Sequence, residues 1–125
     1  MKVINLKKLA NTERDVMFTG GNSIRPILQS DGLGFAMMKT IIPKGGPHFW
    51  HYDKHLEACY CIKGAGILTN YWTGERFEIL PDTVYIQDKH EEHTFEAVEE
   101  TILISIFNPP LKGNETHDEN GNYGV

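Results

Sequence analysis

Short runs of aliphatic, aromatic and β-branched residues, separated by turn-forming residues, make up most of the chain after residue 24. Clusters such as Ser30-Asp-Gly32 and Pro43-Lys-Gly-Gly-Pro47 divide one run from the next. Short strands at near-regular spacing predict an all-β barrel or sandwich. The predicted strands cover residues 25–29, 35–42, 56–62, 66–72, 75–79, 83–87, 93–97 and 101–107.

The two ends of the chain depart from this pattern. Asn5 is a residue type that caps helices, and Leu6 and Leu9 follow it at helical spacing, with Asn11 at the expected end. Residues 108–125 are rich in Pro, Gly, Asn and Asp, which is typical of a loop. We therefore predict one short N-terminal helix and a loop-like C-terminal arm around a β-structure.

Length and charge narrow the range of functions. A chain of 125 residues has the size of one domain, so we expect a single domain over residues 1–125. Twelve basic and seventeen acidic side chains give a net charge of −5, which argues against a nucleic-acid partner. No apolar run approaches the roughly 18 residues of a membrane helix, and the N-terminus lacks a signal-peptide pattern. We expect neither a membrane partner nor export.

The only two cysteines, Cys59 and Cys61, lie two residues apart in a predicted strand. Such residues share one face of the strand, with Cα atoms roughly 6.5–7 Å apart, at or beyond the limit for a disulfide. We therefore expect reduced thiols and a cytoplasmic protein.

Histidines cluster in one part of the sequence, since five of the six lie between His48 and His93. Within this region Glu57 is followed by six residues and then Gly64, the spacing of the first cupin motif. The two histidine positions before the glutamate hold His51 and Asp53, so the match is partial. A second cupin-like segment begins at residues 81–83 and continues through a predicted strand to His93.

These motifs predict a metal site inside the barrel. Alternate residues of a barrel strand face inward, so a carboxylate from Glu57, a phenolate from Tyr85 and an imidazole from His93 can meet in the lumen. Two oxygen donors and one nitrogen donor suit iron better than a metal that prefers thiolates. The alternative interpretation is that Glu57 is a charge at the rim and that the other histidines of the cluster, His48, His51 and His90, are solvated loop residues.

Longer segments carry a more specific resemblance. Residues 52–66 and 85–93 contribute to it, and the run Phe107-Asn-Pro-Pro110 followed by Gly113-Asn-Glu-Thr-His-Asp-Glu119 is its most specific part. Asp31-Gly-Leu-Gly-Phe35 and Thr12-Glu-Arg14 add weaker matches. Over nearly its whole length the chain resembles the ectoine synthases, which are small cytoplasmic cupins.

The resemblance implies a fold, a cofactor and a site. The fold would be a cupin-type jelly-roll barrel capped by the C-terminal arm, and the protein would form a homodimer. Fe(2+) would be held by Glu57, Tyr85 and His93, the same three residues that strand alternation brings together. The substrate-contacting residues implied by the matches are Arg25, Thr40, Tyr52, His55, Phe107, Glu115 and His117.

Each of these substrate-contacting residues also has an ordinary structural interpretation. Without the resemblance, Arg25 would be a surface cation and Phe107 a core aromatic residue. Glu115 and His117 would be solvated residues of a polar arm, and they matter only if that arm folds back over the barrel mouth.

Three positions depart from the family pattern. The family usually has a Trp-x-Ser-x-Arg segment, and here Gly21 stands where the tryptophan is expected while Ser23 and Arg25 are kept. A polar residue is usual at Met38 and a cysteine at Ser105. These positions line the pocket, and a changed lining alters substrate preference more readily than it removes metal chemistry.

The resemblance also implies a reaction, the closure of N4-acetyl-L-2,4-diaminobutanoate to a cyclic amidine with loss of water. Arg25 suits a bidentate contact with the substrate carboxylate, and Tyr52, His55 and His117 are candidates for proton transfer. The alternatives are a related enzyme acting on another amide or amidine, a cupin iron dioxygenase, and a non-catalytic cupin that binds a small zwitterion.

Overall fold

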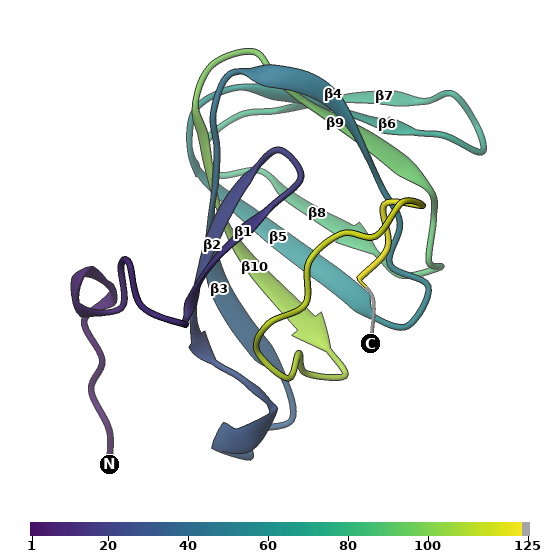
Figure 1. Cartoon of the computed structure of the whole chain (residues 1–125). Helices are drawn as coiled ribbons and strands as arrows, with labels where there is room; N and C mark the ends of the chain where they lie inside the picture. The colour runs from purple at the N-terminus through teal and green to yellow at the C-terminus, as the bar shows by residue number, and fades with distance from the viewer. Residues whose placement is uncertain (124–125) are drawn as a thin grey trace.

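Two antiparallel sheets face each other in the computed structural model, which describes residues 1–123 (Figure 1). The six-stranded sheet has the order β1-β2-β3-β10-β5-β8, and the four-stranded sheet has the order β4-β9-β6-β7. The strands are β1 (Asp15–Phe18), β2 (Gly21–Ile27), β3 (Ala36–Ile42), β4 (Gly45–Trp50), β5 (Leu56–Lys63), β6 (Gly66–Asn70), β7 (Arg76–Ile79), β8 (Val84–Gln87), β9 (His93–Ala97) and β10 (Thr101–Asn108).

Alternation along the strands places one set of side chains between the sheets. In β3, β9 and β10 every second residue is buried, starting from Ala36, His93 and Thr101 respectively. In β5 the buried residues are Glu57, Cys59 and Cys61, the face predicted from the period of two. Both thiols are free, as expected. The region between the sheets therefore combines an apolar core with a small number of buried polar groups.

The all-β prediction is confirmed, and each predicted run overlaps a strand, but two strands were missed. The sequence pattern predicts a turn at the start of β4 because Gly45, Gly46 and Pro47 are turn-forming residues. Here they enter a strand that pairs with β9 through a register shift between Gly45 and His48. β1 was missed because its four residues, Asp15–Phe18, show too short a pattern; they form a hairpin with β2.

The predicted N-terminal helix is shorter than expected. The structure has a single turn of 3₁₀ helix, η1 (Leu6–Lys8), and the Asn5 side chain caps it by accepting a hydrogen bond from the Lys7 N–H. Asn11 has a positive φ of 61°, which prevents helical continuation in that region. A second 3₁₀ turn, η2 (Gln29–Asp31), occupies the predicted turn before Gly32. No helix within residues 1–123 has the length and apolar character needed to cross a membrane.

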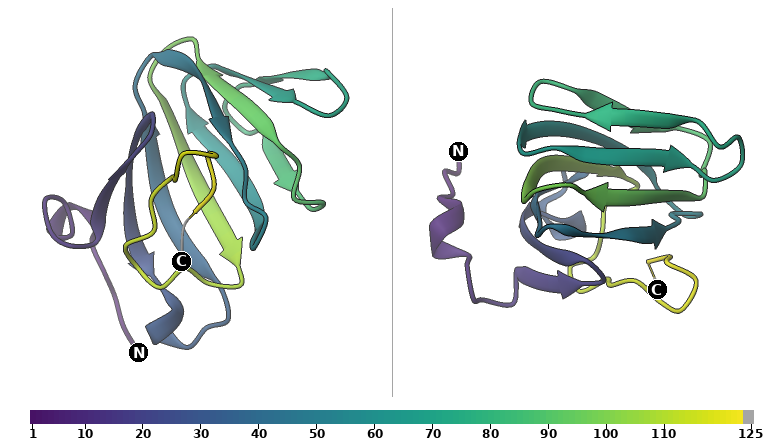
Figure 2. Two further views of the ribbon diagram at one scale, coloured as in Figure 1. Left: turned by 45° about the vertical axis from the view of Figure 1, so that its right-hand side comes forward. Right: turned by 90° about the horizontal axis from the view of Figure 1, so that it is seen from above.

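The C-terminal arm, residues 109–123, runs back across one end of the two sheets (Figures 1 and 2). Near its start the Leu111 carbonyl accepts a hydrogen bond from the Gln29 N–H, and near its end the Gly121 carbonyl accepts one from the His51 N–H. The predicted arm is therefore confirmed as irregular and tied to both sheets. At the opposite side of the molecule, β7 and β8 are the edge strands of their sheets.

Candidate functional site

The three predicted metal ligands lie on the inner faces of three strands. Glu57 is on β5, Tyr85 on the neighbouring β8, and His93 on β9 of the facing sheet. Their side chains are buried, with exposed fractions of 7% for Glu57, 8% for Tyr85 and 1% for His93. The interpretation of Glu57 as a rim charge is therefore wrong.

Two of these ligands carry buried atoms without a hydrogen-bond partner. They are Oε1 of Glu57 and Nε2 of His93. The Nδ1–H of His93 donates to the Glu91 carbonyl oxygen at 3.0 Å, which leaves the lone pair on Nε2. Because an unpaired buried polar atom is costly, each of these atoms would gain from a cation. The donor set, with the phenol of Tyr85, therefore fits a hard metal ion such as iron.

Burial sets the charge state of these groups. It raises the pKa of Glu57 to about 7 and lowers the pKa of His93 to about 4, because both charged forms lose hydration. A neutral imidazole is the form that binds metals. No group of three His, Cys, Asp or Glu residues suited to a metal occurs in the described part of the chain, and the predicted set contains only two residues of those types beside its tyrosine.

A chain of small polar side chains runs from β5 to β3 next to Glu57, Tyr85 and His93, the predicted metal-ligand set. The Cys59 thiol donates to Ser105 Oγ at 3.4 Å, and Ser105 Oγ lies 2.9 Å from Thr40 Oγ1. Cys59 is the cross-strand partner of Tyr85, and Ser105 is the partner of Met38 on β3. Two of the departures from the family pattern, Met38 and Ser105, are thus neighbours, which makes them a paired change in the floor of the lumen.

Arg25 is completely buried, so its interpretation as a surface cation is wrong. Its Nε–H donates to Ser23 Oγ at 2.9 Å, and its terminal nitrogens donate to the carbonyl oxygens of Gly113 and Glu115 at 3.2 and 2.7 Å. A guanidinium group has five N–H donors, so these three bonds leave two for another partner. Arg25 therefore fixes the C-terminal arm to β2.

Glu115 is also buried rather than solvated. Its carboxylate accepts hydrogen bonds from the backbone N–H groups of Lys112 and Gly113 at 2.7 and 2.8 Å and lies 3.9 Å from Arg25. Burial alone would raise the pKa of Glu115, but these N–H groups and the Arg25 charge outweigh burial and lower it. An ionised carboxylate thus lies beside the guanidinium under the arm.

Tyr52 and His117 form a hydrogen-bonded pair between the barrel and the arm. The Tyr52 hydroxyl lies 2.7 Å from His117 Nε2, and His117 Nδ1 is buried without a partner. Burial lowers the pKa of His117 to about 3 and raises the pKa of Tyr52 well above its ordinary value. Both groups are neutral near pH 7, as a pair that passes protons requires.

The remaining predicted residues connect this pair to the metal-ligand set. The Phe107 ring on β10 packs edge-on against Tyr52 and His55, and Phe107 is the cross-strand partner of Glu57. His55 Nδ1–H donates to the Pro109 carbonyl oxygen at 2.8 Å, so its Nε2 keeps a lone pair. The ring centroids of Tyr52 and His93 are 5.8 Å apart. The two predicted groups of residues therefore adjoin through Tyr52 and Phe107.

An aromatic layer that the sequence pattern did not predict closes this end of the lumen. Trp50 stacks on His117 with centroids 5.4 Å apart, and His117 stacks on Tyr123 at 4.8 Å. Phe18 packs edge-on against His117 at 5.2 Å and against Trp50 at 5.8 Å. A period of two in β4 would have paired Trp50 with His48, but its glycines and proline hid the strand.

Phe18 stands beside the position where the family has its tryptophan. Gly21 begins β2 directly after the hairpin, and a Cβ atom there would collide with the Ile41 carbonyl oxygen. This close approach of two backbones requires glycine. Phe18 on β1 adds an edge-on aromatic contact with His117 at this place.

The other histidines of the cluster have structural roles. His48 was interpreted as a loop residue, but it lies on β4 and stacks on Trp50 at 5.8 Å. His90 lies in the loop after β8, as expected, and its Nδ1–H donates to the Tyr52 carbonyl oxygen at 2.9 Å. His51 directly follows β4 and binds the arm through its backbone N–H.

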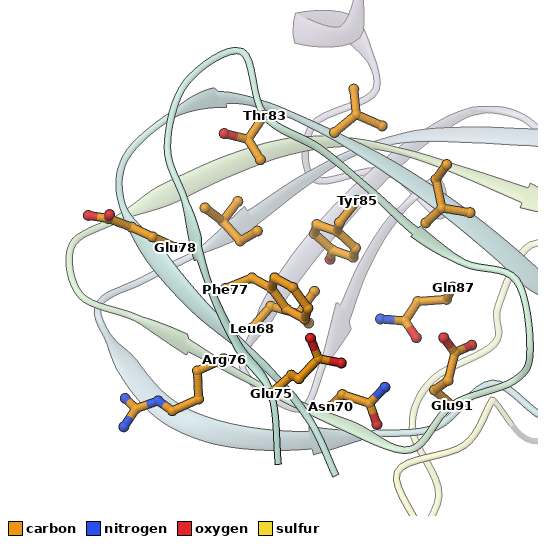
Figure 3. Close-up of a pocket in the computed structure, with 13 residues that line it drawn as sticks. Leu68, Asn70, Glu75, Arg76, Phe77, Glu78, Thr83, Tyr85, Gln87 and Glu91 are labelled. Carbon is orange, nitrogen blue, oxygen red and sulfur yellow. The ribbon is translucent and has the colours of Figure 1, made fainter. Parts of the chain in front are cut away.

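A cavity of about 640 Å³ opens between β6, β7 and β8 (Figure 3). Tyr85 and Gln87 from β8, Phe77 from β7 and Leu68 from β6 line it. Among the predicted site residues within the described chain, Tyr85 alone lines this cavity. The predicted substrate contacts therefore lie elsewhere, toward the arm.

Comparisons with known proteins give the family of the chain. The sequence model described as ectoine synthase matches residues 1–125. The chain belongs to the ectoine synthase family. It is 45% identical over 128 residues to an L-ectoine synthase of Desulfatibacillum aliphaticivorans, covering 100% of this chain and 98% of that protein. It is 40% identical over 123 residues to one of Mycobacterium sp. (strain KMS), covering 98% and 95%.

Solved structures give the same family and fold. The crystal structure of ectoine synthase from P. lautus matches with a TM-score of 0.86 and 37% identity, covering 90% of this chain and 81% of that one. A predicted oxalate decarboxylase from Thermotoga maritima matches with a TM-score of 0.68 and 13% identity over 86% of this chain and 99% of that one, a likeness of fold alone. The prediction of a cupin-type barrel and of ectoine synthase membership is confirmed.

Proposed function

We propose that the protein closes N4-acetyl-L-2,4-diaminobutanoate to ectoine with loss of water. The observation that carries this proposal is that the residues matched to the family lie around one lumen, where all but the half-buried His117 are buried. Glu57, Tyr85 and His93 form one group, and Arg25, Glu115 and the Tyr52–His117 pair form the other. Relatives that are 40–45% identical over nearly their full length are L-ectoine synthases.

Ring closure needs a polarised amide carbonyl, a neutral amine and an acid for the departing oxygen. Glu57, Tyr85 and His93 would hold Fe(2+), which supplies Lewis acidity toward the carbonyl oxygen. The 2-amino nitrogen forms a bond to the carbonyl carbon and loses its two protons, and the carbonyl oxygen takes up two protons and leaves as water. The amide nitrogen and the new nitrogen then share the amidine double bond.

The arm side of the lumen supplies the groups that bind the substrate. The two remaining N–H groups of Arg25 suit the substrate carboxylate, since a guanidinium can donate two parallel hydrogen bonds. Glu115 lies beside Arg25 and can accept a hydrogen bond from the substrate 2-amino group, which shares its carbon atom with the carboxylate. Holding this end of a flexible substrate, while the acetamide lies at the metal centre, favours the cyclising conformer and can contribute several kcal/mol to rate.

Proton transfer is assigned to the neutral residues at the same end. The short contact between the Tyr52 hydroxyl and His117 orients the hydroxyl, which can donate its proton to the departing oxygen and regain one from the attacking amine nitrogen. His55, whose Nδ1–H is fixed by the Pro109 carbonyl, presents Nε2 as a base. Because the aromatic layer excludes water, these transfers stay within the site.

Three single variants test the proposal: Glu57→Ala, Tyr85→Ala and His93→Ala. Each is expected to lower bound iron and to reduce product formation by at least a hundredfold, since each removes a metal ligand. Iron is measured by elemental analysis and ectoine by mass spectrometry. Full activity in all three variants without bound metal would overturn the assignment.

A related substrate is the second candidate, and the changed lumen floor favours it. Met38 and Ser105 replace the polar and cysteine residues expected at these paired positions. A substrate with a larger acyl group would test this lining directly. Faster closure of an N4-propionyl analogue than of the N4-acetyl compound would assign the enzyme to a different amide.

We also propose that one domain spans residues 1–125 and that it works in the cytoplasm as a homodimer. The free thiols support a reducing compartment. The outer face of β5 and β8 exposes Tyr60, Ile62, Val84 and Ile86, and cross-strand pairing places Tyr60 beside Val84. Such an apolar patch at a sheet edge suits a second copy of the chain. Ile86→Lys should convert dimer to monomer in analytical ultracentrifugation; a wild-type monomer would contradict the dimer.

A further inference from the structure

The cavity between β6, β7 and β8 reaches the metal-ligand set from the side opposite the arm. Tyr85 lines it directly. Two carboxamide residues in its lining, Gln87 and Asn70, are cross-strand partners of the other two ligands: Gln87 pairs with Glu57, and Asn70 pairs with His93. Every candidate ligand is therefore either in the cavity wall or next to it.

Gln87 has an unexplained polar atom. Its side chain is 6% exposed, and its Oε1 has no hydrogen-bond partner. Figure 3 shows the Gln87 carboxamide extending into the cavity, beside the side chains of Asn70 and Glu91. A buried carboxamide oxygen without a donor calls for an N–H group, a water or a cation in this space.

The charged groups at this end of the cavity have one sign. The carboxylates of Glu75 and Glu91 lie around the same end as Gln87 (Figure 3), and the Glu91 carbonyl oxygen also accepts the Nδ1–H of His93. Arg76 and Glu78 belong to the wall, but their charged groups point away from this cluster. The cavity end thus offers oxygen acceptors and negative charge, which attract cations.

The opposite approach is closed. Trp50, His117 and Tyr123 stack in a layer over the lumen, and hydrogen bonds from Arg25 hold the arm in place. A hydrated cation would have to cross stacked rings there. On the cavity side, the cation would meet the carboxylates of Glu75 and Glu91 and then the carboxamide of Gln87.

We propose that this cavity is an acidic vestibule that binds a hydrated divalent cation and passes it to the buried ligands. The inference rests on the proposed metal centre formed by Glu57, Tyr85 and His93. The vestibule is a transient site: two carboxylates and a carboxamide oxygen replace part of the hydration shell before the stronger donors take over. Negative charge in a cleft of this kind raises association rates by tenfold or more.

The test is the rate of metal uptake, which does not depend on catalysis. Metal-free protein is mixed with Co²⁺ in a stopped-flow instrument, and the visible absorption of bound Co²⁺ is followed. The double variant Glu75→Gln/Glu91→Gln should take up metal three- to tenfold more slowly at low salt, with the difference shrinking in 0.5 M salt. Gln87→Leu should also slow uptake, because it removes the buried acceptor.

Glu78→Gln is the control. It removes one negative charge from β7, a strand of the vestibule wall, but from a side chain that points away from Gln87. Its uptake rate should stay within twofold of the wild type. Equal rates for Glu78→Gln and the double variant would overturn the vestibule. Faster loading in Phe18→Ala would also overturn it, because metal would then pass through the aromatic layer. A wild-type protein that binds no metal would instead contradict the proposed metal centre.

Discussion

The two approaches to the lumen are built from different chemistry. On the arm side, Arg25, Glu115 and Tyr52 have hydrogen-bond partners and stacked rings cover them, while His117 Nδ1 is buried without a partner. On the vestibule side, Gln87 lines a cavity of about 640 Å³, and its buried Oε1 has no partner. The covered side, where most polar groups are paired, suits one substrate held in one geometry, whereas the side with the cavity is suited to exchange with solvent. The difference predicts opposite responses to substitution.

The largest effect is expected from Arg25→Met on the arm side. This change removes the guanidinium donor from the carbonyl oxygens of Gly113 and Glu115, and it leaves the buried Glu115 carboxylate without a positive charge beside it. Loss of one member of a buried ion pair costs about 3–5 kcal/mol, so the free energy of unfolding should fall by about that amount. Urea denaturation measures it. Arg76→Met, which removes a guanidinium group that points away from the vestibule, is the control and should change stability by less than about 0.5 kcal/mol.

Tyr52→Phe on the arm side should show whether the Tyr52 hydroxyl takes part in proton transfer, because the packing of the ring is unchanged. The ring contacts with Phe107 and Tyr123 are kept, but the hydrogen bond to His117 is lost. Removing a proton-transfer group lowers kcat by about 10²–10⁴-fold, with KM changing little. Steady-state kinetics gives both constants, and Tyr60→Phe on the exposed face of β5 is the control. A rise in KM at unchanged kcat would assign Tyr52 to binding alone.

His117 makes the arm side sensitive to acid. Its folded pKa of about 3 lies below the unfolded value of about 6.5, so between these pH values the unfolded chain binds one more proton. Stability from this group is therefore present above pH 6.5 and is lost as the pH falls. Between pH 7 and pH 5 the loss is up to about 2 kcal/mol.

In His117→Asn, this fall in the free energy of unfolding between pH 7 and pH 5 should be absent. Urea denaturation of metal-free protein at the two pH values measures it, and comparing variant with wild type cancels the opposite contribution of Glu57, whose pKa is raised. An equal pH dependence in the two proteins would show that His117 does not titrate as a buried neutral group.

Gln87→Leu on the vestibule side has the smallest expected effect, and it should raise the free energy of unfolding, whereas Arg25→Met lowers it. Replacing an unpaired buried carboxamide by an apolar side chain of similar size removes a desolvation cost of about 1–3 kcal/mol. Metal-free Gln87→Leu should therefore be about 1 kcal/mol more stable than the wild type in urea denaturation. A destabilised variant would mean that the two sides of the lumen do not differ in this way.

Much of the fold follows from local pattern. The period of two in β5 predicted that Glu57, Cys59 and Cys61 share a face, and the turn residues after Ile42 and Ile62 marked strand ends. β4 could not be found because Gly45, Gly46 and Pro47 are turn-forming residues, and only pairing with β9 makes them a strand. Strand pairing is a long-range property that local propensity does not contain.

Some residues of the candidate site could also be predicted from the sequence, and others could not. Cupin-motif spacing and strand alternation together predicted that Glu57, Tyr85 and His93 meet, but residues of the arm needed the family resemblance, since a polar loop gives no periodic signal. Neither source predicted Phe18 or Gln87. Phe18 depends on how the β1–β2 hairpin packs against the arm, and the importance of Gln87 depends on its lacking a partner. Both depend on contacts between residues that are distant in the sequence, so the local pattern does not contain them.

Product formation by the iron-loaded protein is the most direct test of the central claim that one buried metal centre, covered by the arm, closes the acetylated substrate. Metal-free protein, protein loaded with Fe(2+), and Fe(2+)-treated Glu57→Ala are each incubated without oxygen with N4-acetyl-L-2,4-diaminobutanoate, and mass spectrometry follows the product. The account predicts a product lighter by one water with loaded wild-type protein alone. Equal product formation by all three samples, or none by protein that carries iron, would contradict it.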